Sequence, residues 1–333
     1  MNRATALVGL ATVTLSAAIA GLGLARADES SPPESQDHAL MALDDPVVDL
    51  VGTIEVAWET VAGTERAEVD VAAVDGTFVA RHDGAAYAAD ASGNVFELDG
   101  EWAIISAAGG ARPDPRDKYE LTTAPGEPIA GRPSTTVEAS YGGAVTQRIA
   151  FDAEYGFVLG HEWLDPDGAP RRSVRFLALT VGTSDADPIS PIVPDDPQQD
   201  APESLDDVGA PFTDPDRAFP GYRLVERLDH GDGLIQLEYS DGLARVSVFE
   251  RHGELDRASV PDGGGWVEVA GHSTYELVTA RGWLLVWEDD EIVYTVIGDA
   301  PRLELEQFAD QVDGENRGTL AQLADGLVDL FSF

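Results

Sequence analysis

The stretch "LEYSDGLARVSVFE", Leu237 to Glu250, places two alternating runs on either side of an Asp-Gly pair. Apolar residues recur at every second position from Ile235 to Tyr239, and again from Ala244 to Val248. A period of two is typical of a β-strand with one buried face. Gly242 supplies the positive φ that a tight turn requires. The stretch therefore predicts a β-hairpin, yet it carries no residue typical of catalysis.

Similar runs follow one another between Val47 and Val181. The expected strands are "LVGTIEVAWET", "ERAEVDVAAV", "GTFVARHDG", "NVFELDGEWAIIS", "STTVEASYG", "AVTQRIAFD", "GFVLGHEWLD" and "RRSVRFLALTV". Turn-forming pairs separate them, among them Asp75-Gly76, Asp83-Gly84, Asp99-Gly100, Gly142-Gly143 and Asp167-Gly168. Strands joined by short turns predict an antiparallel meander. Because a meander rich in aromatic residues tends to close its edges, we expect a barrel or half-barrel.

A smaller unit follows, with the opening hairpin, further strands and then "DAPRLELEQFADQV". In this last segment Asp299 is a candidate helix cap and Pro301 suits a first helical turn. Leu305, Phe308, Ala309 and Val312 recur with helical spacing on one stripe. The predicted fold class is α+β and mostly antiparallel β, with a half-barrel over residues 46–182 and a small α+β domain over residues 218–313.

The segments that flank these domains differ in composition. Residues 28–45 are polar and are expected to be flexible. Residues 183–217 are rich in Pro and Asp, which predicts an extended, self-repelling acidic linker. Residues 314–333 have apolar residues at helical spacing and no basic residue after Arg317. We expect an amphipathic helix there that packs on the domain or on a partner.

The N-terminal residues 1–27 resemble an export signal. An apolar stretch over residues 4–24 follows Arg3, and Ala25 and Ala27 form an Ala-x-Ala cleavage site before an acidic segment. The stretch is long for a signal peptide and almost long enough to span a bilayer, so a retained anchor is an alternative, and a buried helix is another. With either a cleaved signal or a retained anchor, the rest of the chain is expected to be periplasmic or otherwise extracytoplasmic.

The charge and the absence of cysteine exclude several classes of function. The net charge is −40 and the isoelectric point is near 4.1, so a phosphate backbone would be repelled and nucleic-acid binding is not expected. Without cysteine there are no disulfides, thiol nucleophiles, thiolate zinc sites or lipobox. Lys118 is the only lysine, a bias that we interpret as a property of GC-rich coding.

Motifs for chemistry are lacking. The six histidines form no His-x-x-x-His pair, there is no Gly-x-Ser-x-Gly segment, and the Asp-Gly segments lack the spacing of a calcium loop. His161 and Glu162 are neighbours that point to opposite faces of a strand, and we interpret His161 as a surface or core residue. The sequence therefore predicts a protein that is not an enzyme, with no cofactor and no metal.

Aromatic residues of the first domain are the remaining candidate site. They are Trp58, Phe78, Phe96, Trp102, Phe151, Phe157, Trp163 and Phe176. One interpretation is an ordinary filled core. The other is an apolar cavity or groove of the half-barrel that takes a lipid chain or a partner segment.

Four segments resemble the MucB/RseB family of sigma-E factor regulatory proteins. The first two are "AGRPSTTVEA", Ala130 to Ala139, and "FDAEYGFVLGHEWLDPDGAPRRSVRFLALTV", Phe151 to Val181. The other two are the opening hairpin and "IVYTVIGDAPRLELEQFADQV", a strand that enters a helix start. They occur in the family's order, and the resemblance spans most of residues 46–312. The acidic linker and the tail after Asp313 have no counterpart.

The resemblance implies an exported regulator with a LolA-like (lipoprotein-carrier-like) first domain. It implies binding to the extracytoplasmic part of a single-pass membrane anti-sigma factor, protection of that protein from site-1 proteolysis, and release by envelope lipids or mislocalised lipoproteins in envelope stress. The hairpin would then be a sheet scaffold for protein contact through shape and edge hydrogen bonds. A lipid or lipoprotein carrier that uses an apolar cavity is the alternative function.

Overall fold

The computed structural model describes residues 49–312, apart from gaps at 61–62, 75–76, 83–84, 90–94, 98–103, 107–112, 166, 183–202, 205–218, 220, 230–232, 259, 261–262, 280–281 and 290. The chain divides into two compact units. Unit 1 contains Met1–Ala108 and Tyr119–Gln199, and unit 2 contains Gly109–Lys118 and Asp200–Phe333. A short segment from the middle of the predicted first domain thus belongs to unit 2.

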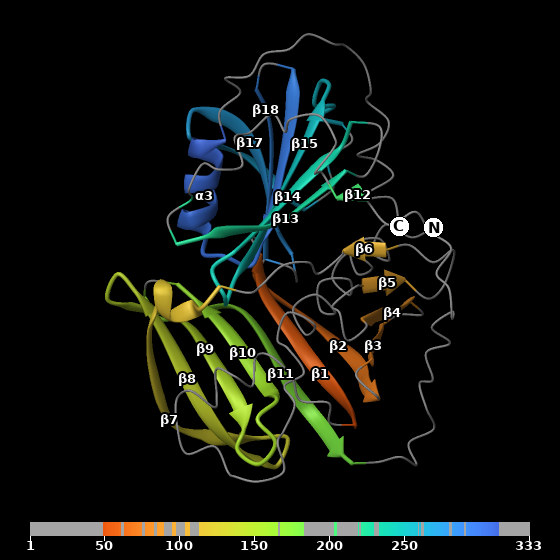
Figure 1. Cartoon of the computed structure of the whole chain (residues 1–333), viewed down its shortest axis with the longest axis vertical. Coiled ribbons are helices and arrows are strands. Elements are labelled where there is room, and N and C mark those ends of the chain that lie inside the picture. The colour runs from red at the N-terminus through yellow and green to blue at the C-terminus, as the bar shows by residue number, and fades with distance from the viewer. Residues whose placement is uncertain are drawn as a thin grey trace. The chain divides into compact units, whose positions relative to one another are not determined.

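Unit 1 is built on one antiparallel sheet of 11 strands, here called sheet A (Figure 1). Its strands are β1 (Leu50–Thr60), β2 (Gly63–Val74), β3 (Thr77–His82), β4 (Ala85–Ala89), β5 (Val95–Glu97), β6 (Ile104–Ser106), β7 (Glu120–Ile129), β8 (Arg132–Tyr141), β9 (Ala144–Asp152), β10 (Val158–Leu164) and β11 (Pro170–Val181). The order is β6-β5-β4-β3-β2-β1-β11-β10-β9-β8-β7, so two meanders meet where β1 pairs with β11.

The second half of sheet A is strongly curled. This is seen where β7 approaches β11, although three strands lie between them in the sheet. Ile129, at the end of β7, comes so close to Gly160 of β10 that a Cβ on the glycine would lie 3.4 Å from the isoleucine Cδ1. The predicted antiparallel meander is therefore confirmed, and the curvature provides a face that side chains can fill from within.

Two strands of sheet A, β4 and β7, were not among the strands predicted from the sequence. The Ala-rich β4 has almost no hydrophobic alternation, and β7 contains Pro125 and Pro128, which lack the N–H that an interior strand needs. The structure explains the second case, because β7 is an edge strand and pairs only with β8. Prolines on an exposed edge also hinder pairing with another chain.

The two faces of sheet A are chemically distinct. On one face Arg148 of β9 lies between Glu138 of β8 and Glu162 of β10, with its Nε 2.8 Å and its Nη1 3.5 Å from their carboxylates. The hydrogen bond that Arg148 donates to the Glu138 carboxylate raises the pKa of Arg148 above its ordinary value. On the other face the same strands present the buried Val137, Ile149 and His161. This second face carries the core of unit 1.

Unit 2 is built on a second antiparallel sheet of eight strands, sheet B. Its strands are β12 (Glu203–Ser204), β13 (Arg223–Asp229), β14 (Ile235–Ser240), β15 (Arg245–His252), β16 (Gly265–Val269), β17 (His272–Thr279), β18 (Gly282–Asp289) and β19 (Ile292–Gly298), in the order β12-β13-β14-β15-β19-β18-β17-β16. The predicted hairpin is β14–β15, with Leu237 opposite Val248. Gly242 has the predicted positive φ, +95°.

Helix α3 (Arg302–Gln311) packs its apolar stripe on sheet B. Leu305, Phe308, Ala309 and Val312 are all buried, as predicted. The expected cap is wrong, because the residue before the helix is Pro301, without a side-chain cap. The Asp299 carboxylate instead accepts a hydrogen bond from the backbone N–H of Arg245, at 2.7 Å, so it joins the entrance of the helix to the start of β15.

The predicted fold class, α+β and mostly antiparallel β, is confirmed for the described residues, in which α3 packs on the antiparallel sheet B. The leader with Ala25 and Ala27, the segment 28–45 and the helix 314–333 lie outside the described residues. Of the predicted linker, the structure describes only Glu203 and Ser204, which pair with Asp229 and Leu228 of β13. Among the residues that the structure describes, no helix is long and apolar enough to cross a membrane.

Candidate functional site

The predicted aromatic residues gather on the core face of sheet A as far as the structure describes them. Phe151, Phe157, Trp163 and Phe176 are buried, and Phe157 meets Phe176 edge to face with ring centroids 6.5 Å apart. Trp58 of β1 is half-buried and lies opposite Arg172 on the same face. Phe78 and Phe96 lie on β3 and β5, with side chains outside the described set, and Trp102 lies outside the described residues.

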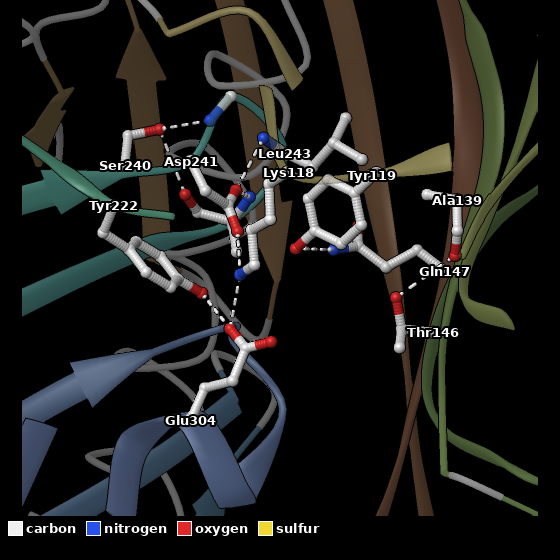
Figure 2. A network of polar contacts seen from close by, with 12 residues as sticks. Lys118, Tyr119, Ala139, Thr146, Gln147, Tyr222, Ser240, Asp241, Leu243 and Glu304 are labelled. Atoms are coloured by element: carbon white, nitrogen blue, oxygen red, sulfur yellow. Dashed lines mark hydrogen bonds and ion pairs between the residues drawn. The ribbon is translucent and has the colours of Figure 1, made fainter. Parts of the chain in front are cut away.

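The same face holds a buried polar row that sequence reasoning missed. Trp163 stacks on His161 at 3.6 Å between ring centroids, and the Arg172 guanidinium carbon lies 4.0 Å from the Trp163 ring centre. His161 Nε2 lies 2.8 Å from Gln147 Oε1. Figure 2 shows the other end of this amide, where Gln147 Nε2 donates to the Tyr119 hydroxyl at 3.4 Å. These side chains are buried, so His161 is a core residue. Polar residues at inward positions of β9, β10 and β11 were the available signal.

Unit 2 contains a second buried polar group, centred on the only lysine of the chain. The Lys118 ammonium nitrogen lies 2.6 Å from Asp241 Oδ2 and 2.6 Å from Glu304 Oε2, and its side chain is 1% exposed. The Tyr222 hydroxyl donates to the same Glu304 oxygen at 2.6 Å, and the ammonium lies 4.1 Å from the centre of the Tyr222 ring. Figure 2 shows the lysine between the two carboxylates. The Lys118 side chain is therefore buried and paired within unit 2.

The segment that carries this lysine, residues 113–118, is here called the strap. A single turn of 3₁₀ helix, η1 (Pro115–Asp117), shapes it: the Asp114 carboxylate accepts from Arg116 N at 2.9 Å, and the backbone N–H of Lys118 donates to the Pro115 carbonyl. Pro113 and Pro115 are buried, and Asp117 pairs with Arg223 at 2.5 Å on the exposed side. The short helix aims Lys118 into the unit while Asp114, Arg116 and Asp117 stay exposed.

The turn of the β14–β15 hairpin is built to receive the strap. Asp241 Oδ1 accepts from the backbone N–H groups of Leu243 and Ala244, at 2.9 and 2.7 Å, which leaves Oδ2 for the lysine. A Cβ on Gly242 would lie 2.4 Å from the Pro113 carbonyl oxygen. Glycine is therefore required here for close approach as well as for its φ. The opening sequence motif serves to seat the strap.

The expected use of the hairpin for edge hydrogen bonds is wrong. Strands β14 and β15 are interior strands, since β14 pairs with β13 and β15, and β15 pairs with β14 and β19. Their backbone groups are engaged on both sides. Within the described part of unit 2 the sheet ends at β12 and β16, and β12 has only two residues.

Neither polar group resembles a catalytic or metal centre. Over the described ranges, no group of three or more His, Cys, Asp or Glu is placed to hold a metal ion. Lys118 is held by carboxylates whose oxygens already accept strong hydrogen bonds, and His161 is stacked on an indole and bonded to an amide. The arrangement can bind an ammonium group and can fix an aromatic core.

Comparison with known proteins finds no matching family model and no matching curated protein. Solved structures do match. The crystal structure of MucB is 18% identical over 83% of this chain and 94% of that chain, with a TM-score of 0.48. The complex structure of Pseudomonas aeruginosa MucA/MucB is 17% identical over 94% of this chain and 100% of that chain, with a TM-score of 0.44. A putative outer membrane lipoprotein-sorting protein domain from Vibrio parahaemolyticus is 13% identical over 42% and 87%, with a TM-score of 0.23. At these values the similarities assign no activity or partner to this chain.

Proposed function

We propose that the chain is an exported regulatory protein that binds the extracytoplasmic part of a membrane anti-sigma factor and modulates its proteolysis in envelope stress. The observation that carries this proposal is the set of four co-linear segments that resemble the MucB/RseB family. Residues 130–139 form the β7–β8 turn and most of β8, and residues 151–181 form the end of β9 with β10 and β11. Residues 237–250 contain the β14–β15 hairpin, and residues 292–312 contain β19 and α3.

Within each unit, the segments that resemble the family are also neighbours in the structure. In unit 2 the two segments pair directly, with Val248 of β15 opposite Val296 of β19, and Leu305 of α3 packs in the same core. In unit 1 the two segments form most of β8 and all of β10 and β11, which are three of the five strands of the curled half of sheet A. Matches that share one core support a common fold framework better than matches scattered over the surface would.

A protein that acts by binding a partner can offer backbone hydrogen-bonding groups that its own sheet does not use. Edge strands offer such groups, and an added strand from the partner uses them. We assign this role to β16, because its five residues contain no proline and it carries Trp266, which is 38% exposed beneath the Arg257 guanidinium. Strand β7, the described edge of sheet A opposite β6, is interrupted by two prolines.

The test is binding between the chain from residue 28 onward and the extracytoplasmic segment of the single-pass anti-sigma factor encoded beside it, measured by biolayer interferometry in several detergents. We expect binding, and protection of that segment from site-1 protease. Trp266→Ala should weaken the affinity at least tenfold, since truncation of a central interface tryptophan costs about 2 kcal/mol. Leu177→Ala is the matched control, because Leu177 is a similarly exposed apolar residue on β11.

The outcomes separate the two claims. No binding by the unaltered chain would reject the partner. Binding that Trp266→Ala leaves unchanged, or that Leu177→Ala weakens equally, would reject β16 as the contact strand and leave the partner in place.

A lipid or lipoprotein carrier is the second candidate, favoured by the aromatic side chains collected on the curled face of sheet A. A carrier must hold an acyl chain among such residues. Native mass spectrometry of the purified chain is then expected to show co-purified mass in the range of acyl lipids, lost on mild organic extraction. A single mass equal to that of the bare polypeptide, before and after incubation with phospholipid vesicles, would contradict this function.

A further inference from the structure

The structure assigns to unit 2 a binding pocket for a primary ammonium group, which the strap fills in cis with Lys118. The pocket has three parts: the Asp241 carboxylate, the Glu304 carboxylate and the face of Tyr222. Both oxygen contacts are 2.6 Å, a length typical of strong charge-assisted hydrogen bonds. The aromatic face at 4.1 Å is within the range of a cation–π contact.

The carboxylates are placed by their own hydrogen bonds and by the elements that carry them. Asp241 is held by two backbone N–H groups of its turn, and Glu304 is held by the Tyr222 hydroxyl. Asp241 follows β14 and Glu304 lies in the first turn of α3, and both elements belong to the core that Phe308 and Tyr239 share. The pocket is therefore set by the framework of unit 2, and the lysine is its occupant.

The unbranched stem of Lys118 reaches the ammonium pocket along a path beside Gly221. Gly221 lines it, and a Cβ there would lie 2.8 Å from Lys118 Cδ and 3.0 Å from Lys118 Cγ. Gly221 also has a φ of +79°, so a larger residue here would strain the backbone and would press on the lysine stem. The ligand class is therefore a primary ammonium group at the end of a straight aliphatic chain, which a lysine side chain supplies.

Among the charged side chains of the strap, that of Lys118 is buried in unit 2, and those of Asp114, Arg116 and Asp117 are exposed. Asp117 pairs with Arg223, and Arg116 pairs with Asp114, through side chains that are 46–66% exposed. Ion pairs between such exposed side chains contribute little to stability. The buried strap prolines provide apolar contact. Loss of the lysine should therefore loosen the strap and leave the pocket open to an external ligand.

Chemical rescue of the full-length Lys118→Ala chain tests the pocket. Alanine removes Cγ, Cδ, Cε and Nζ, which are the heavy atoms of n-propylammonium. We expect the hydrogen-exchange protection of residues 240–244 to fall in the variant and to return, saturably, with n-propylammonium chloride. At a ligand concentration ten times the dissociation constant, the unfolding equilibrium constant of unit 2 should fall about elevenfold. Tetramethylammonium chloride, a cation without N–H donors, and 1-propanol, without charge, are the controls and should have no such effect.

Amine labelling of the unaltered chain gives an independent readout, because Lys118 is the only lysine and the α-amino group is the only other primary amine. With an acetylating reagent, Lys118 should react at least tenfold more slowly than in Glu304→Gln, while Glu306→Gln should match the unaltered chain. Glu306 lies two residues further along α3 and pairs with Arg302 at 2.5 Å.

Three results would overturn the assignment. The first is equal rescue by tetramethylammonium, which would be an ionic-strength effect only. The second is a folded Lys118→Ala chain that n-propylammonium does not alter. The third, decisive where Lys118→Ala does not fold, is acetylation of Lys118 in the unaltered chain as fast as in urea.

Discussion

Replacement of Lys118 by methionine is expected to lower the free energy of unfolding of unit 2 by about 3–5 kcal/mol, because it removes one partner of a buried ion pair and leaves two carboxylates uncompensated. The Asp241 side chain is fully buried, and the Glu304 side chain is 9% exposed, so water screens neither charge well. Methionine keeps most of the stem volume. The expected loss of stability is therefore electrostatic and does not come from a loss of packed side-chain volume.

The measurement is a urea series with pulsed hydrogen exchange, followed on peptides of unit 2. Arg116→Met is the matched control on the exposed side of the strap and should change the stability by less than about 0.5 kcal/mol. In the double variant Lys118→Met/Glu304→Gln, the cost should be smaller than the sum of the single costs, because the two groups interact directly. Additive costs would contradict a direct interaction between Lys118 and Glu304. A Lys118→Met chain as stable as the Arg116→Met chain would show that the lysine carries no net stabilisation.

Phe308→Ala is expected to cost unit 2 a similar amount, about 3–5 kcal/mol, by opening a cavity among aromatic rings in its core. Phe308 is 1% exposed and stacks on Phe219 with ring centroids 3.9 Å apart. Tyr222 and Tyr239 meet it edge to face at 5.0 and 5.5 Å. These rigid rings cannot collapse into the space that the alanine leaves.

The same urea series measures this cost, with Leu303→Ala as the control on the same helix. Leu303 is 60% exposed, so its truncation should stay within about 0.5 kcal/mol. Phe308→Ala should also weaken protection of the strap, because Tyr222 packs on Phe308 and lines the ammonium pocket. A loss below about 1 kcal/mol would mean that the aromatic cluster repacks, and would contradict the rigid-core account.

Local patterns were sufficient to predict most strands and the helix. Alternation located β1, β9 and β11 almost residue by residue, and the spacing of Leu305, Phe308 and Val312 identified the buried face of α3. The patterns failed where tertiary context decides. The prolines of β7 are compatible with a strand only because that strand is an edge, and Asp299 bonds to Arg245 and not to its own helix.

The polar groups could not be predicted, because their partners are distant in sequence. Lys118 and Glu304 are 186 residues apart, and His161 and Gln147 meet only through the register of β9 and β10. A lone lysine has no periodicity from which to infer burial. The aromatic residues of β10 and β11 were identified as a set, yet the composition of a strand does not state whether the face they share is filled.

The long separation between Lys118 and its carboxylates has a consequence for biosynthesis. The ribosome adds the lysine 123 residues before Asp241 and 186 residues before Glu304. During that interval the pair of carboxylates is incomplete, so the strap cannot acquire its final surroundings before Glu304 has been added. We expect a product that ends before α3, whether truncated or clipped by a protease, to lack Glu304 and to keep a more reactive amine. One acylation reagent thus distinguishes finished molecules from incomplete ones.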